Sequence, residues 1–127
     1  MEGGRRATIL TGLGALYGLF DLERGSDGFN TGFAFPEVLL AILREFRAGN
    51  RDGASAIFTR HLPLIVFEQQ PGLAIRKEIL RLRGLLTSNR VRHPGATIDA
   101  ATSEQLQRLL AATFPGEDLT QPLKITP

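Results

Sequence analysis

The residue types that usually carry catalysis are few in this chain and widely spaced. There is no cysteine, which excludes disulfides, thiolate metal sites and cysteine nucleophiles. His61 and His93 are far apart, and no carboxylate stands at helical ligand spacing from them, so we expect no metal site. His61 and Glu68, two helical turns apart, are expected to form a surface pair. Lysine occurs twice, at Lys77 and Lys124, so most of the basic residues are arginines.

Two glycines follow the first apolar segment of the chain, and their spacing has two interpretations. Gly12-x-Gly14 after a strand resembles the start of a phosphate-binding turn. However, Tyr17 occupies the place of the third glycine of a dinucleotide fingerprint, and no acidic residue about 20 positions on caps a following strand. The pattern therefore favours a tight turn between a strand and a helix.

Asn30 and Thr31 alternate with Phe29 at the end of a second expected strand. Polar side chains at this place can line a ligand pocket. They can also pack in the interior, with a hydroxyl that satisfies a neighbouring backbone group. The sequence leaves these two interpretations open.

A basic stretch lies in the second half of the chain, interleaved with leucines. It consists of Arg76, Lys77, Arg81, Arg83, Arg90 and Arg92. Aromatic residues for base stacking are missing there, and the net charge of the chain is only +2, so we expect no nucleic-acid partner. A solvated helix face with ion pairs, such as Lys77 or Arg81 with Glu78, is favoured. Glu68 and the two glutamines after it are expected to cap or bridge helices.

Hydrophobic periodicity predicts two strands and four longer helices. The expected order is a strand at 7–11, a helix at 15–23, a strand at 28–34, and helices at 36–48, 52–69, 73–86 and 102–113. Pro63 is expected to kink or split the second long helix, and Val66 and Leu86 are expected to face inward. Thr102 is the expected cap of the last helix, in a capping box with Gln105. The tail from Glu117 to Pro127 is expected to be disordered.

A strand, a helix and a strand in so short a segment predict one βαβ unit with parallel strands. Two parallel strands alone do not make a stable sheet, because parallel sheets need both faces covered and both edges paired. Two strands followed by several helices therefore look like the end of a larger α/β fold.

Two dense motifs carry a resemblance that accounts for this layout. TGLGALYGLFDLERGSDGFNTGFAFPE and FEQQPGLAIRKE resemble the C-terminal third of the dihydrodipicolinate synthase / N-acetylneuraminate lyase family. The second motif is most similar to the branch of dehydratases related to L-2-keto-3-deoxyarabonate dehydratase. The resemblance implies an α/β fold, with the last two strands of a TIM (β/α)₈ barrel followed by a C-terminal helical bundle. The expected organisation is 1–48 for the last two βα units, 49–114 for the helical extension and 115–127 for a disordered tail.

The resemblance also implies a Schiff-base lyase that acts on pyruvate or 2-oxo sugar acids without a metal or other cofactor. The family's Schiff-base lysine on strand six and its proton-relaying tyrosine on strand five would both lie upstream of Met1. No catalytic residue is therefore expected in this chain, and the chain alone is expected to be inactive. The positions expected to bind substrate are Gly12, Gly14, Asn30, Thr31 and Gly32. Gly14-Ala15 stands where sialic-acid lyases have acidic residues, which argues against such a substrate.

The expected partners are a small-molecule 2-oxo acid in the complete enzyme, the missing N-terminal barrel half and further copies of the chain in a homo-oligomer. With no long apolar run and no leader pattern, we expect a cytoplasmic location and no membrane contact. The alternative is a non-catalytic helical protein-interaction module. The sequence does not specify the natural substrate or the oligomeric state. It also does not say whether the chain is a gene-model fragment, one half of a split enzyme or a pseudogene product.

Overall fold

The computed structural model describes residue 4 and residues 6–127, and most of the elements in these residues are helical. In chain order they are β1 (Leu10–Thr11), a short 3₁₀ turn (Leu13–Ala15), α1 (Gly18–Glu23), β2 (Gly28–Phe29), α2 (Pro36–Arg47), α3 (Arg51–Phe67), α4 (Leu73–Leu82) and α5 (Ala100–Thr113). No helix in the described part of the chain is both long and apolar enough to cross a membrane.

The two strands pair in parallel, as predicted, although each is shorter than expected. Leu10 pairs with Gly28 and Thr11 with Phe29. The Thr11 hydroxyl donates to Oδ2 of Asp21 at 2.6 Å and so ties β1 to the crossover helix α1. The strands stay short because the glycine turn after Thr11 and the bend after Phe29 end the ladder.

Local signals set the limits of α2 and the start of α3. Pro36 occupies the first turn of α2, where its missing N–H costs nothing, and Glu37 lies at the positive end of the helix dipole. Gly49 ends the helix in the left-handed region, with φ +78°. Asn50 then caps α3 by accepting a hydrogen bond from the N–H of Gly53 at 3.1 Å.

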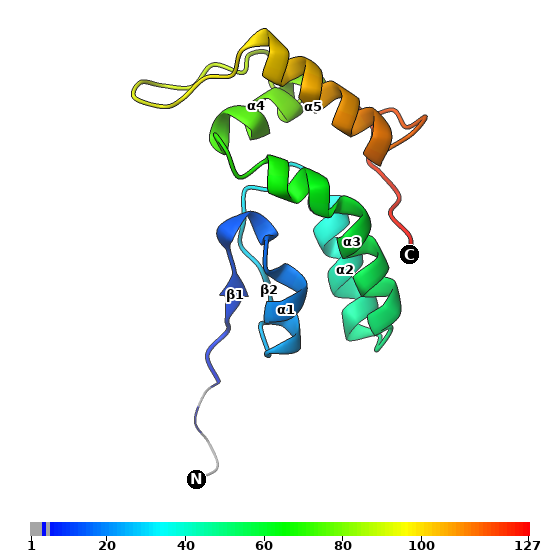
Figure 1. Ribbon diagram of the computed structural model, residues 1–127. Coiled ribbons are helices and arrows are strands. Elements are labelled where there is room, and N and C mark those ends of the chain that lie inside the picture. The colour runs from blue at the N-terminus through cyan, green and yellow to red at the C-terminus, as the bar shows by residue number, and fades with distance from the viewer. Residues whose placement is uncertain (1–3, 5) are drawn as a thin grey trace.

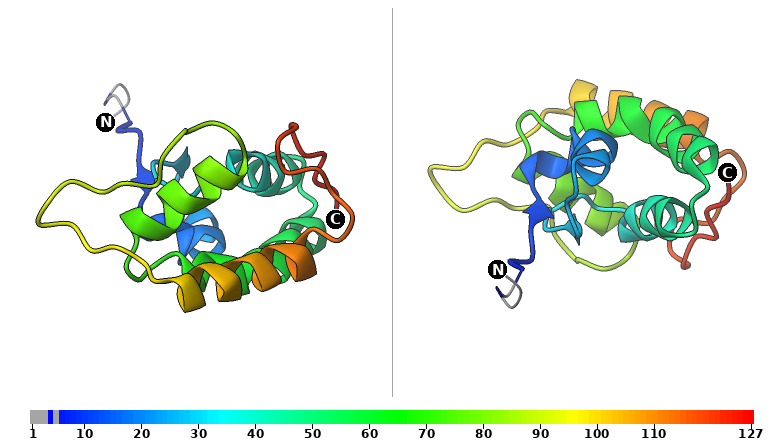
Figure 2. Two further views of the ribbon diagram at one scale, coloured as in Figure 1. Left: turned by 90° about the horizontal axis from the view of Figure 1, so that it is seen from above. Right: turned by 90° about the horizontal axis from the view of Figure 1, so that it is seen from below.

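The helices cover one side of the small sheet. Figure 1 shows α2 and α3 as an antiparallel pair beside the strands, with α4 and α5 beyond one end of that pair. In Figure 2 the loop between α4 and α5 reaches away from the rest of the molecule. The core lies where α2, α3 and α5 meet, and its fully buried members include Phe35, Ile42, Ile57, Ile65 and Leu106.

Two helices differ from their predicted extents. α3 runs unbroken through Pro63, so the proline does not split it, and Figure 1 shows the helix bending along its length. α4 ends at Leu82 rather than Leu86, because Gly84 takes a positive φ of 75° and stops the helix. Leu86 therefore lies beyond the helical periodicity and is exposed. Val66, expected to face inward, is also exposed, since it follows the buried Leu64 and Ile65 round to the outer face of α3.

The start of α5 corrects the predicted capping box. Asp99, not Thr102, is the N-cap, and its carboxylate accepts a hydrogen bond from the N–H of Thr102 at 2.7 Å. Thr102 lies inside the first turn of the helix. Aspartate is at least as good an N-cap as threonine, and here it stands three residues earlier.

Replacing Asp99 by alanine is therefore expected to lower the melting temperature by a few degrees, because the first turn of α5 loses its side-chain acceptor. Replacing Thr102 by alanine is expected to leave it nearly unchanged. Thermal unfolding followed by circular dichroism measures both variants. A larger drop in melting temperature for the Thr102 variant would show that Thr102, and not Asp99, caps the helix.

The C-terminal segment is packed on the helices, so the expectation of a disordered tail was wrong. Leu123 and Ile125 are buried against the core. Arg44 donates to the carbonyl of Ile125 at 3.0 Å, and Arg60 donates to the carbonyl of Thr126 at 2.7 Å. The C-terminal segment has no regular secondary structure. It is held in place by the buried side chains of Leu123 and Ile125 and by hydrogen bonds from one arginine of α2 and one of α3.

Candidate functional site

The carboxyl ends of the two strands lie side by side and bring several predicted site residues together. The N–H of Asn30 donates to the carbonyl of Thr11 at 2.8 Å and so continues the pairing past both strands. A methyl group added at Gly12 would lie 3.7 Å from the carbonyl oxygen of Asn30, so these two positions are in contact. Asn30 is exposed at this edge.

Gly14 belongs to a turn with unusual backbone geometry. Leu13, Gly14 and Ala15 have φ values of 49°, 61° and 68°, which is the left-handed region that side chains with a Cβ disfavour. Such strain persists only where the surrounding structure enforces it, and it concentrates at functional sites. The tight turn expected from the glycine spacing is therefore present, and it is strained.

Thr31 and Gly32 follow β2 and differ in their surroundings. The Thr31 hydroxyl accepts a hydrogen bond from the N–H of Phe33 at 2.9 Å, so it satisfies a neighbouring backbone group. This contact is the one that the second interpretation of the sequence describes, and it does not decide whether Thr31 also lines a pocket. Gly32 is exposed, and its Cα faces the side chain of Arg76.

Arg76 and Glu68 also lie at the strand ends, although the sequence pattern did not predict it. Nε of Arg76 donates to Oε1 of Glu68 at 3.0 Å, and the N–H of Ala34 donates to Oε2 of the same carboxylate at 3.3 Å. Glu68 is fully buried, and burial raises its pKa to about 7 against the opposing effect of these two donors. The motif FEQQPGLAIRKE contains both residues, but its spacing alone does not show what they contact.

Several other charged residues also differ from their predicted surroundings. His61 is buried, packs against the tilted ring of Phe114 at a ring distance of 5.4 Å and makes a hydrogen bond to the carbonyl of Ile57. It forms no surface pair with Glu68, and burial lowers its pKa. Arg83 is buried rather than solvated, whereas the expected pair of Arg81 with Glu78 is present at 2.8 Å. No cluster of metal-binding side chains occurs among the described residues.

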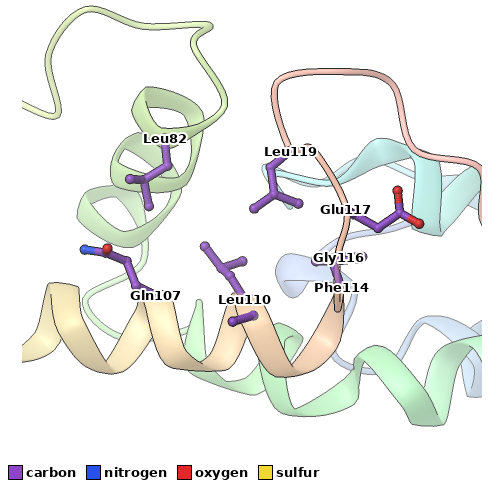
Figure 3. Close-up of a pocket in the computed structure, with 8 residues that line it drawn as sticks. Leu82, Gln107, Leu110, Phe114, Gly116, Glu117 and Leu119 are labelled. Atoms are coloured by element: carbon purple, nitrogen blue, oxygen red, sulfur yellow. The ribbon is translucent and has the colours of Figure 1, made fainter.

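A separate hollow of about 350 Å³ lies between α4, α5 and the segment that follows α5. Figure 3 shows Leu82, Leu110 and Leu119 facing one another across it. Its lining contains no residue of the strand ends and is mostly apolar, so it offers little for catalysis.

Two parallel strands with strained and glycine-containing carboxyl ends, followed by a helical bundle, are the arrangement found at the end of an α/β barrel. The chain superposes on a dihydrodipicolinate synthase from Rhodopseudomonas palustris with a TM-score of 0.81 and 43% identity, over 85% of this chain and 36% of that one. It is also 37% identical to L-2-keto-3-deoxyarabonate dehydratase of Azospirillum brasilense over 89 residues, which are 69% of this chain and 29% of that protein. No protein-family model matches the chain.

The chain thus has the sequence and the fold of the C-terminal portion of a protein of the dihydrodipicolinate synthase family. It spans 29% of the length of the dehydratase and 36% of the length of the synthase. These matches confirm the resemblance identified from the two motifs.

Proposed function

We propose that this chain supplies the C-terminal portion of a Schiff-base-forming lyase that acts on pyruvate or a 2-oxo sugar acid. The observation that supports this most is the strained, glycine-containing edge at the ends of β1 and β2, in a chain similar in sequence to a 2-keto-3-deoxy sugar-acid dehydratase. Active sites of barrel enzymes form at this edge. Gly12, Gly14, Asn30, Thr31 and Gly32 are the positions that we propose for the substrate pocket.

We propose further that the Schiff-base lysine belongs to a part of the enzyme outside these 127 residues. Lys77 lies on α4 and donates to the carbonyl of Arg90, and Lys124 is exposed in the C-terminal segment. Neither stands at the end of a strand. Within this proposal, residues 1–48 form the last two barrel units and residues 49–114 form the helical extension. We propose in addition that the complete enzyme is a cytoplasmic homo-oligomer.

Exposed apolar groups mark where the rest of a barrel would pack. Ile9 and Leu10 at the free edge of β1 are 59% and 49% exposed. On the other side, a hollow of about 240 Å³ opens beside β2 and α2, lined by Phe29, Leu40 and Leu43 among others. Phe33, close to this hollow, is itself buried against Phe35 at a ring distance of 6.0 Å. A neighbouring strand on each side would cover both surfaces.

Treatment with pyruvate and borohydride tests this proposal. A lysine amine condenses with the ketone and releases water, and borohydride reduces the imine to a stable secondary amine that mass spectrometry detects. The chain alone is expected to remain unmodified. Co-expressed with the N-terminal portion of the Azospirillum dehydratase, it is expected to form a soluble complex that is labelled on that portion and dehydrates a 2-keto-3-deoxy sugar acid.

Stoichiometric labelling of Lys77 in the chain alone would contradict the assignment of the lysine. A monomeric chain that never associates with the N-terminal portion would favour the helical interaction module instead. The apolar hollow between α4 and α5 would then be the surface to investigate.

A further inference from the structure

The turn after β1 needs support from outside itself. Three consecutive positive φ values, at Leu13, Gly14 and Ala15, are unfavourable for the two residues that carry a Cβ. Within the turn, the N–H of Ala15 bonds to the carbonyl of Gly12 at 3.0 Å and that of Leu16 to the carbonyl of Leu13 at 3.1 Å. These bonds describe the turn but do not explain why it keeps this conformation.

The side chains of Gln69, after α3, and of Arg76, on α4, lie against this turn. A methyl group added at Gly14 would overlap Nε2 of Gln69 and would lie 2.9 Å from a terminal nitrogen of Arg76. Gln69 is itself fixed, since Nε2 donates to the carbonyl of Ile65 at 3.0 Å. Gly14 thus lets the helical side chains reach the turn backbone itself.

Arg76 also contacts the segment after the other strand. A methyl group added at Gly32 would lie 3.3 Å from both Cδ and a terminal nitrogen of Arg76. The same side chain therefore lies against Gly14 after β1 and against Gly32 after β2. These are two of the five positions proposed for the pocket.

Glu68 holds Arg76 in this place. Its carboxylate accepts from Nε of Arg76 at 3.0 Å and from the N–H of Ala34, just after Gly32, at 3.3 Å. The side chain of Arg76 is only 22% exposed and that of Glu68 is 0% exposed. Because Glu68 already takes up the Nε donor of Arg76 in a buried contact, the arginine is suited to holding backbone in place rather than to binding an anion.

We propose that Arg76, anchored by Glu68, is a positioning residue that fixes the two strand-end segments of the pocket relative to each other. This assignment rests on the proposed function for its role in catalysis, but its structural content concerns residues 12–16 and 30–34 of this chain alone. An ion pair that merely added stability would slow the opening of the whole molecule equally and would have no special effect on these two segments.

The test compares amide hydrogen exchange of the full chain with that of a Glu68→Gln/Arg76→Gln double variant, which removes both charges together and leaves no buried ion unpaired. The matched control is Glu78→Gln/Arg81→Gln. That pair also joins a buried glutamate to an arginine on α4, but its further bonds go to Asn89 and Ser103, away from the strands.

Loss of the Glu68–Arg76 pair is expected to speed exchange at 12–16 and 30–34 by about ten-fold or more, the factor that corresponds to one charge-assisted hydrogen bond. Amides of α2, α3 and α5 are expected to change much less, and the control variant is expected to spare both segments. Arg76→Lys, which keeps the charge but lacks the planar guanidinium, is expected to give an intermediate effect. Equal acceleration everywhere, or unchanged exchange at both segments, would overturn the proposal.

Kinetics on the reconstituted complex give a second readout. If Arg76 positions the pocket, Arg76→Lys lowers kcat/KM by about ten-fold or more while borohydride still labels the N-terminal portion. Wild-type kinetics in an active complex would overturn the positioning role and leave the proposed function standing. If no complex is active, the proposed function fails, and the exchange experiment still decides whether Arg76 fixes the two segments.

Discussion

Replacing Arg83 by methionine is expected to lower the free energy of unfolding by about 3 to 5 kcal/mol, the loss typical of removing one partner from a buried ion pair. Arg83 is 5% exposed and donates to both carboxylate oxygens of Glu37, at 2.6 and 3.1 Å. It also donates to the carbonyls of Ala34 at 2.9 Å and Leu119 at 3.0 Å. Its guanidinium lies 4.7 Å from the centre of the Phe35 ring.

The size of this effect follows from how many segments meet at one side chain. Arg83 follows α4, Glu37 opens α2, Ala34 precedes α2, and Leu119 lies in the segment after α5. Methionine fills similar space but leaves a carboxylate and two carbonyls without their donor. The loss should therefore extend from α2 to the C-terminal segment.

Urea denaturation of the two proteins measures the difference in free energy of unfolding. Arg108→Met on the exposed face of α5 removes the same charge and is expected to change stability by no more than about 0.5 kcal/mol. A loss below about 1 kcal/mol for Arg83→Met would show that Arg83 contributes no more than an exposed ion pair does.

The helix ends were predictable where one residue determines the backbone locally. Pro36 starts α2, Gly49 ends it and Gly25 follows the end of α1 with a φ of 104°. Each of these residues restricts or frees φ, so its effect does not depend on distant parts of the chain. The parallel pairing of the strands was predictable for a similar reason, since a short helix between two apolar segments requires a crossover.

The partners of the buried charged residues were not predictable, because they are far away in sequence. Arg83 belongs to the basic stretch that was expected to be solvated. It instead pairs with Glu37, which is 46 positions away in the sequence. Glu68 meets the N–H of Ala34 across 34 positions. Helical spacing places Arg83 four residues after the buried Ile79 and places Arg81 on the surface side, but it does not show which partner would pair with a buried guanidinium. The order of the C-terminal segment has the same origin, in contacts with Arg44 and Arg60.

The candidate site likewise contains contacts that the sequence predicted and contacts that it did not. Gly12 and Asn30 were expected to meet because the carboxyl ends of parallel strands lie at one edge of a sheet, and they are in contact. Gln69 and Arg76 also reach this edge, but they lie far along the chain, in the turn after α3 and on α4. Glycine at two strand ends was the only local sign that something packs closely against the backbone there.

Glu68 is expected to make the stability of the protein fall as the pH rises towards neutrality. Burial raises its pKa from 4.5 to about 7 in the folded protein, so the folded state holds a proton that the unfolded state has already released. Stability from this group is fully present below about pH 4.5 and is lost as the pH rises through about 7. The size of the change is on the order of 3 kcal/mol, because each unit of pKa corresponds to about 1.4 kcal/mol.

The measurement is urea denaturation of the wild type and of Glu68→Gln across this pH range, with the difference between the two followed as a function of pH. That difference isolates Glu68, since all other groups titrate in both proteins. Glu78→Gln is the matched control, for which the stability difference is expected to change with pH in the opposite direction. Hydrogen bonds from Arg81 lower the pKa of Glu78, so its contribution is lost as the pH falls instead. Parallel stability curves for the wild type and Glu68→Gln would mean that Glu68 is already ionised when folded, fully stabilised by Arg76 and the N–H of Ala34. The contact of Arg76 with Glu68 would then be independent of pH across this range. If instead the expected pH dependence is found, Glu68 becomes charged, and the ion pair with Arg76 forms, only as the pH rises through about 7.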